Sequence, residues 1–156
     1  MPRGQFARDT EKTEAETRAD IEQVLTKYGA SGYGCLHEGD HWRIIFHINE
    51  RMVQVDFTTP QREDFVHDSA GRNRPITRVQ GAWEQGRRSF WRAIYNVIKF
   101  KLEAVVIGFS TLEREFLADV LLPDGSKVGE WLQPQLDRVY KSGTMPPMLP
   151  EARKAE

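Results

Sequence analysis

The pattern of hydrophobic and polar positions first predicts a short helix that begins at about Thr17. Apolar residues recur there at the i, i+3, i+4, i+7 spacing of a single helical stripe. They are Ile21, Val24, Leu25 and Tyr28. Gly29 follows directly, and glycine is favoured just after a helix end because that position is often left-handed. We therefore expect a helix of about three turns, preceded by a flexible polar tail over residues 1–16.

Three short segments that alternate between apolar and polar positions come next, over about 32–38, 41–49 and 52–59. Period-2 alternation with β-branched and aromatic residues is typical of half-buried strands. In the second segment the apolar positions are Trp42, Ile44, Phe46 and Ile48. Glu38-Gly39-Asp40 and Asn49-Glu50-Arg51 supply turns between the segments. The pattern predicts an antiparallel meander.

A long polar segment and a long helix follow the predicted meander. Residues 60–80 are rich in charge and contain Gly71 and Pro75, which indicates a long, basic, mobile loop. From about Gly81 to Ile107 a helical stripe recurs at 3, 4, 4, 3 spacing. It consists of Trp91, Ile94, Ile98, Leu102 and Val105, and Phe90, Val97 and Ala104 are expected to widen it.

The C-terminal third predicts two further helices. Ser110-Thr111-Leu112-Glu113 matches a capping box, with Phe116 and Leu117 expected to face inward. After a Pro-Asp-Gly turn, a helix is expected over about 128–141, bent at Pro134. Its predicted buried face consists of Val128, Trp131, Leu132, Leu136, Val139 and Tyr140. The exit segment 143–150 is expected to lie over the core through Met145, Met148 and Leu149.

These elements predict an α+β fold: an antiparallel three-stranded meander, preceded by a short helix and packed against a long helix, with additional C-terminal helices. Residues 17–145 are expected to form a single domain, and residues 146–156 a C-terminal tail. The chain has 156 residues with a net charge of −1. No apolar run is long enough for a membrane span and no signal peptide is evident. Cys35 is the single cysteine, expected to be a buried structural residue.

The distribution of charge is more informative than its total. Residues 71–102 contain eight basic residues and one acidic residue, a net charge of +7, whereas the rest of the chain contains 14 basic and 22 acidic residues, a net charge of −8. Such asymmetry indicates an anionic partner. Arginine and lysine neutralise phosphates without reading sequence, and exposed aromatics stack single-stranded bases. The predicted nucleic-acid-binding residues are Arg72, Arg74, Arg78, Trp83, Arg87, Arg88, Arg92, Tyr95 and Lys99.

One motif suggests metal chemistry. Residues 37–41, from His37 to His41, match the H-E-x-x-H pattern of zinc metalloproteases, which requires a helix. Gly39-Asp40 predicts a turn there, so we expect the match to be accidental. Acidic residues near 56–68 could be drawn as a nuclease-like cluster, but nothing in the pattern fixes their geometry. We therefore predict a non-enzymatic protein without a metal or cofactor.

Three stretches resemble a family of small, uncharacterised phage and prophage proteins. They are "TKYGASGY", "STLEREFLADVLLPDGSKVGEWLQPQL" and "GTMPPMLP". The resemblance implies the cytoplasm of a bacterial host and a role in phage DNA metabolism. The order of helix, three strands and long helix is also similar to the β-β-β-α core of single-strand annealing recombinases, which implies single-stranded DNA in a basic groove and self-assembly.

The preferred expectation is sequence-tolerant DNA binding, including single-strand binding or annealing in phage or prophage recombination, by a protein that forms homo-oligomers. The alternative is a small phage-type interaction protein that binds and modulates a host protein, such as a defence or nuclease complex. A metal-dependent nuclease is a third alternative. No membrane partner is expected.

Overall fold

In the computed structural model, which describes residues 7–145, helix α1 spans Glu14–Lys27. It begins three residues before Thr17, the predicted start. Thr13 is the reason, because its hydroxyl accepts a 3.1 Å hydrogen bond from the Glu16 N–H while the Glu16 carboxylate accepts a 2.7 Å bond from the Thr13 N–H. This capping box satisfies two N–H groups at the helix start. The predicted end is confirmed, since Gly29 follows with a φ of +95°.

The predicted meander is confirmed as a sheet of three antiparallel strands in the order β1-β2-β3. The strands are β1 (Gly32–Glu38), β2 (His41–Ile48) and β3 (Arg51–Thr58). Gly39-Asp40 and Asn49-Glu50 form the two-residue turns between them. Asn49 and Glu50 both have positive φ, at 46° and 60°, which is the conformation of a type I′ turn and matches the twist of the flanking strands.

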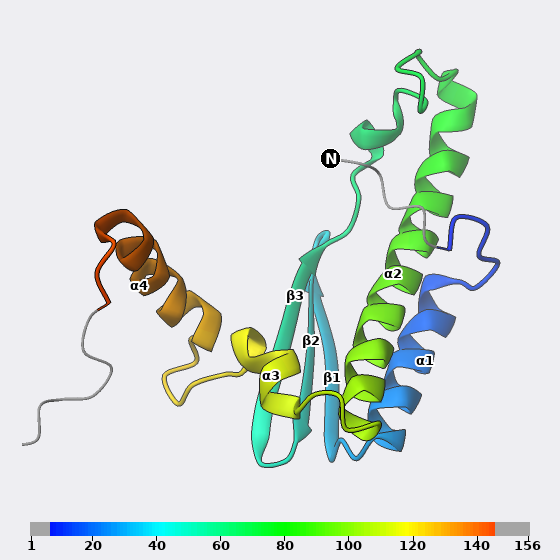
Figure 1. Cartoon of the computed structure of the whole chain (residues 1–156). Helices are drawn as coiled ribbons and strands as arrows, with labels where there is room; N and C mark the ends of the chain where they lie inside the picture. The colour runs from blue at the N-terminus through cyan, green and yellow to red at the C-terminus, as the bar shows by residue number, and fades with distance from the viewer. Residues whose placement is uncertain (1–6, 146–156) are drawn as a thin grey trace, which may run out of the picture.

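The core lies on one face of this sheet. Trp42, Ile44, Phe46 and Ile48 of β2 are buried there, whereas His41, Arg43 and His47 on the other face are exposed. Helices α1 and α2 lie side by side against the buried face (Figure 1). The α+β fold predicted from the two periodicities is therefore present.

Helix α2 spans Ile76–Val106 and supplies the main apolar surface of the core. Trp91 is fully buried, with its ring 4.8 Å from that of Trp42 and 5.0 Å from that of Phe57, both in edge-to-face geometry. Such pairs stabilise a core beyond the area that they bury. Val97 belongs to the predicted core stripe but is exposed, so the expected widening of that stripe is wrong at this position.

The segment predicted as one long loop, residues 60–80, is more ordered than expected. It contains a 3₁₀ turn at Arg62–Phe65, and α2 begins at Ile76, five residues before the predicted start. The Arg74 guanidinium donates to the carbonyls of Phe65 and, at 3.0 Å, His67. These bonds close the loop on itself.

The chain then crosses to the far edge of the sheet. Helix α3 spans Leu112–Phe116 and is capped by Thr111, one residue after the predicted cap at Ser110. Phe116 is buried as predicted, but Leu117 is exposed. After the 3₁₀ turn Leu117–Asp119, the Leu121 N–H donates a 2.8 Å hydrogen bond to the Met52 carbonyl, which extends the sheet beside β3.

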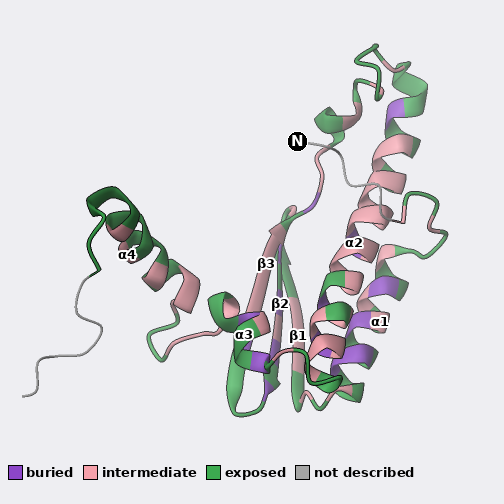
Figure 2. Cartoon of the chain, in the orientation of Figure 1, coloured by how far each residue is buried: buried purple, intermediate pink, exposed green. Residues whose placement is uncertain are grey.

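Helix α4 spans Val128–Ser142, with Pro134 inside it. Its predicted burial is wrong: none of its residues is buried, and Trp131 and Tyr140 are 60% and 87% exposed. The helix projects away from the body, with the sheet between it and α2 (Figure 1), and Figure 2 shows it without a buried position. The periodicity was sufficient to predict the helix, but within residues 7–145 no element buries its apolar side. Met145 is also exposed, while Met148 and Leu149 lie outside the described residues.

The segment before α1 contacts α2. The Gln85 side-chain amide donates to the carbonyls of Arg8 and Thr10, at 2.8 and 3.1 Å, so part of the predicted N-terminal tail lies along α2.

No helix within residues 7–145 has the length and apolarity needed to cross a lipid bilayer.

Candidate functional site

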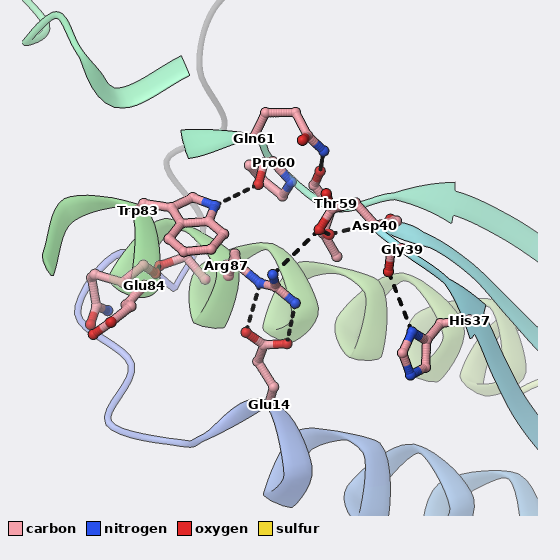
Figure 3. Close-up of polar contacts among 12 residues, drawn as sticks. Glu14, His37, Gly39, Asp40, Thr59, Pro60, Gln61, Trp83, Glu84 and Arg87 are labelled. Atoms are coloured by element: carbon pink, nitrogen blue, oxygen red, sulfur yellow. Dashed lines mark hydrogen bonds and ion pairs between the residues drawn. The ribbon is translucent and has the colours of Figure 1, made fainter. Parts of the chain in front are cut away.

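The nine predicted nucleic-acid-binding residues lie on α2 and on the loop before it, but the structure does not leave them as one free basic surface. Arg87 is held by α1, since its Nε and Nη2 donate to the two carboxylate oxygens of Glu14 at 2.9 and 3.0 Å. Its Nη1 lies 3.4 Å from Asp40 Oδ1, in the β1–β2 turn. Figure 3 shows this guanidinium between the two acids. A bidentate pair of this kind fixes α1 against α2.

Arg92 makes the second link to α1. Its Nη1 donates a 2.6 Å hydrogen bond to Asp20 Oδ2, and its guanidinium carbon lies 3.9 Å from the centre of the Tyr95 ring. Burial acts to raise the pKa of Asp20, but hydrogen bonds from Arg92 and Lys12 outweigh it, so the pKa lies below its ordinary value. Arg92 therefore serves the packing of α1 on α2.

The two predicted base-stacking aromatics are also engaged within the chain. The Trp83 Nε1–H donates a 2.8 Å hydrogen bond to the Pro60 carbonyl, and the Arg87 guanidinium carbon lies 5.3 Å from its ring centre (Figure 3). Tyr95 packs against the core, and Arg92 covers its ring. An arginine of the same helix therefore lies over each of the two half-buried rings.

In the loop before α2, Arg72 and Arg74 bind locally. Arg72 Nε donates to Asp68 Oδ2 at 2.9 Å, and Arg74 bonds the two loop carbonyls described above. Asp68 has a pKa below its ordinary value, chiefly because it accepts hydrogen bonds from the Arg72 and Ala70 N–H groups and the Arg72 side chain. These two arginines therefore hold the loop in its conformation.

Within residues 7–145, four of the seven basic residues in this set have no acidic partner: Arg74, which bonds loop carbonyls, and Arg78, Arg88 and Lys99. Arg78 is exposed, Arg88 donates to Gln85 Oε1 at 3.1 Å from Nε, and Lys99 is half-buried. Arg88 and Lys99 lie on the same flank of α2, because eleven residues are three helical turns. This pair is what remains of the predicted basic row.

The H-E-x-x-H match is a strand, a turn and a strand. His37 faces the core side, where its ring stacks on Trp42 with ring centres 4.3 Å apart. His41 begins β2 on the opposite face, with Nδ1 3.3 Å from Thr58 Oγ1. The two imidazoles therefore do not converge on one ion. Across residues 7–145, no three His, Cys, Asp or Glu side chains are grouped as metal ligands.

A polar cluster that sequence analysis missed anchors the start of α4. Lys127 Nζ lies 2.8 Å from Asp56 Oδ2 and 3.2 Å from Asp119 Oδ1. Gly129 lies against Ala118, whose carbonyl oxygen would be 2.9 Å from an added Cβ. The N-terminal turn of α4 is thus fixed to β3 and to the 3₁₀ turn before it. No helical or strand spacing marks these pairings, because Asp56 lies on another element and Ala118 and Asp119 lie across the turn before α4.

Beyond this anchor, α4 has two sides. Its apolar residues fall within one half of the helix circumference at 100° per residue. They are Val128, Trp131, Leu132, Leu136, Val139 and Tyr140, called here the α4 face. The charged residues lie on the other half: Glu130, Asp137, Arg138 and Lys141. None of these residues is buried within residues 7–145, although Val128, Leu132 and Val139 are partly covered.

Comparison with protein-family models, curated proteins and solved structures gave no match for this chain.

Proposed function

We propose that this is a non-enzymatic interaction protein that binds another protein through α4. The observation that carries the proposal is the α4 face, six apolar residues on one side of a helix that buries none of them. A contiguous apolar patch of this kind is unfavourable in water and is typical of binding surfaces. The site of action in this proposal is the cytoplasm of a bacterial host.

The chemistry of the α4 face suggests the class of partner. An amphipathic helix binds by laying its apolar side into a hydrophobic groove. Trp131 is the expected anchor, because large aromatic side chains dominate the binding energy of such interfaces. Tyr140, which lies about 180° around the helix from Trp131, is at the opposite edge of the α4 face. The anchor at Lys127 and Gly129 holds the start of the helix, which reduces the entropy lost on binding.

Site-specific photo-crosslinking in host cells tests this proposal. A benzophenone amino acid at position 140 is expected to crosslink a discrete host protein, and a Trp131→Glu change in the same chain should abolish that product. The matched control places the benzophenone at Asp137, on the charged side of α4, where no such product should form. Identical products from both positions, or a product unaffected by Trp131→Glu, would contradict the proposal.

Sequence-tolerant DNA binding is a second candidate, favoured by Arg88 and Lys99 on one flank of α2. Two cations that can release counterions from phosphates support weak, salt-sensitive binding. Fluorescence anisotropy with single- and double-stranded oligonucleotides at two salt concentrations measures it. The double change Arg88→Glu and Lys99→Glu should abolish binding, whereas Arg114→Glu on α3 should not. Equal binding by both variants would remove this candidate.

A further inference from the structure

A second apolar stripe runs along α2, on a side that faces away from the core. Its members alternate at spacings of three and four residues. They are Phe90, Ala93, Val97, Phe100, Ala104 and Ile107, the residue that directly follows α2, and are called here the outer stripe. This is the heptad spacing with which helices pair along a seam. Val97, Phe100 and Ile107 are 53%, 58% and 74% exposed.

The outer stripe is distinct from the buried stripe of the same helix. Trp91, Ile98 and Leu102 face the sheet and are buried. Val97 lies 100° around the helix from Ile98, at 100° per residue. A helix with two apolar sides is expected where it packs on two neighbours, yet within residues 7–145 only the first side is fully covered.

The chain itself covers the N-terminal end of this side. The Phe65 ring lies over Gly86, four residues before Phe90, so closely that an added Cβ would be 2.2 Å from the ring. The Phe90 ring in turn lies 5.8 Å from that of Phe57. Apolar side chains of the same chain therefore pack on this side of α2 at Gly86 and Phe90, whereas Val97 and Phe100 are exposed.

The chain's own α4 does not reach the outer stripe. Its start is held at the far edge of the sheet by the ion pairs of Lys127 with Asp56 and Asp119. From that anchor α4 extends away from α2, with the sheet between them (Figure 1). Within residues 7–145, no element covers the outer stripe at Val97, Phe100 and Ile107.

We propose that a second copy of the chain covers the outer stripe, with the two α2 helices packed antiparallel along their outer stripes. A two-fold axis makes one patch complementary to itself, as in most dimers. Centring the axis between Ile98 and Lys99 pairs Val97 with Phe100, Ala93 with Ala104, and Phe90 with Ile107 across the interface. Phe90, Val97 and Ala104 are the a positions of this heptad pattern, and Ala93, Phe100 and Ile107 are the d positions. Each a position therefore meets a d position of the other copy.

Charge favours the antiparallel arrangement over the parallel one. Arg87 and Arg92 are neutralised by α1, which leaves Arg78 and Arg88 as the arginines of α2 without an acidic partner within residues 7–145. Glu113 and Glu115 of α3, which lies beside the C-terminal half of α2 through the Lys101 bond to the Glu115 carbonyl, form no ion pair within those residues. Antiparallel packing brings Arg78 and Arg88 of each α2 toward α3 of its neighbour, while parallel packing would bring the two arginine-rich halves together. The opposed helix dipoles act in the same direction. This inference does not depend on a partner for α4.

Analytical ultracentrifugation of the full chain tests the dimer. The wild type is expected at twice the mass of 18.0 kDa, and Phe100→Glu should raise the dimer dissociation constant at least about tenfold, the effect of 1.4 kcal/mol. The matched control is Tyr140→Glu, also an exposed aromatic, which should leave the dimer unchanged. A monomeric wild type, or a dimer lost through Tyr140→Glu and kept in Phe100→Glu, would overturn the proposal.

A distance measurement tests the orientation without disturbing the stripe. With Cys35 replaced by Ala, a spin label is attached to a cysteine at the exposed position Gln80. At 1.5 Å per residue the antiparallel register separates the two labels by about 55 Å. A parallel pair would hold them about 10 Å apart, the separation of packed helices. The short distance would refute the antiparallel dimer whatever the variants show.

Discussion

Arg92 of α2 and Asp20 of α1 are joined by a 2.6 Å hydrogen bond in which each side chain is only 22% exposed. Because of this pair, Arg92 holds α1 in place and is not a free cation of α2. A variant that reverses the charge of Arg92 would therefore disturb the fold before it tested any ligand.

Replacing Arg92 by Ala is expected to lower the free energy of unfolding by about 2 kcal/mol. The change removes a charge-assisted hydrogen bond and the guanidinium that covers Tyr95. Urea denaturation measures the effect. The control, Arg78→Ala, removes an exposed arginine of the same helix and should stay within about 0.5 kcal/mol of wild type. Similar losses in both variants would argue against the structural role of Arg92.

The Asp56 cluster predicts a loss of stability in acid. Burial acts to raise the pKa of Asp56, but hydrogen bonds from Lys127 and Gln54 lower it below the ordinary 3.8. A carboxyl with a lowered pKa contributes stability that is fully present above its unfolded pKa and is lost as the pH falls through the folded pKa. Unfolding free energies measured from neutral pH down through this range should therefore fall less steeply in Asp56→Asn than in wild type.

Two helical glycines should respond to alanine in opposite directions. Gly81 in α2 has open space around its Cα, so Gly81→Ala is expected to stabilise the protein by up to about 1 kcal/mol through helix propensity. At Gly129 the new Cβ would meet the Ala118 carbonyl oxygen, which is backbone and cannot swing away. Gly129→Ala should therefore release the start of α4, seen as faster amide exchange over Val128–Leu132.

Cys35 is expected to react slowly with thiol reagents. Burial in the sheet raises the pKa of its thiol above the ordinary value, so little thiolate is present at neutral pH. Its rate of reaction with a maleimide should lie well below that of a free cysteine and rise to that value in denaturant. A rate in the folded protein equal to that of free cysteine would contradict the burial of this side chain.

The elements could be predicted from the sequence because their periodicities are strong. The alternation through Trp42, Ile44 and Phe46 and the stripe through Trp91, Ile98 and Leu102 depend only on neighbours within a few residues. Boundaries were less accurate, since the start of α1 depends on a cap at Thr13 and the start of α2 on Pro75.

The candidate site was harder to predict because charge partners can be distant in sequence. A run of basic residues looks the same whether phosphates or the carboxylates of Glu14 and Asp20 neutralise it. The α4 face shows the same limit for apolar residues. A periodic apolar stripe predicts which side of a helix packs against another surface. The local sequence does not show whether that surface belongs to the same chain or to another molecule.

The contacts that join α1 to α2 have a consequence for synthesis on the ribosome. Glu14 binds Arg87, Asp20 binds Arg92 and Tyr28 binds Glu103, over separations of 73, 72 and 75 residues. The three strands are complete at Thr58, yet the helix that covers them ends at Val106. A nascent chain therefore exposes Trp42, Ile44 and Phe46 while the next four dozen residues are added, and this interval is when it most needs a chaperone.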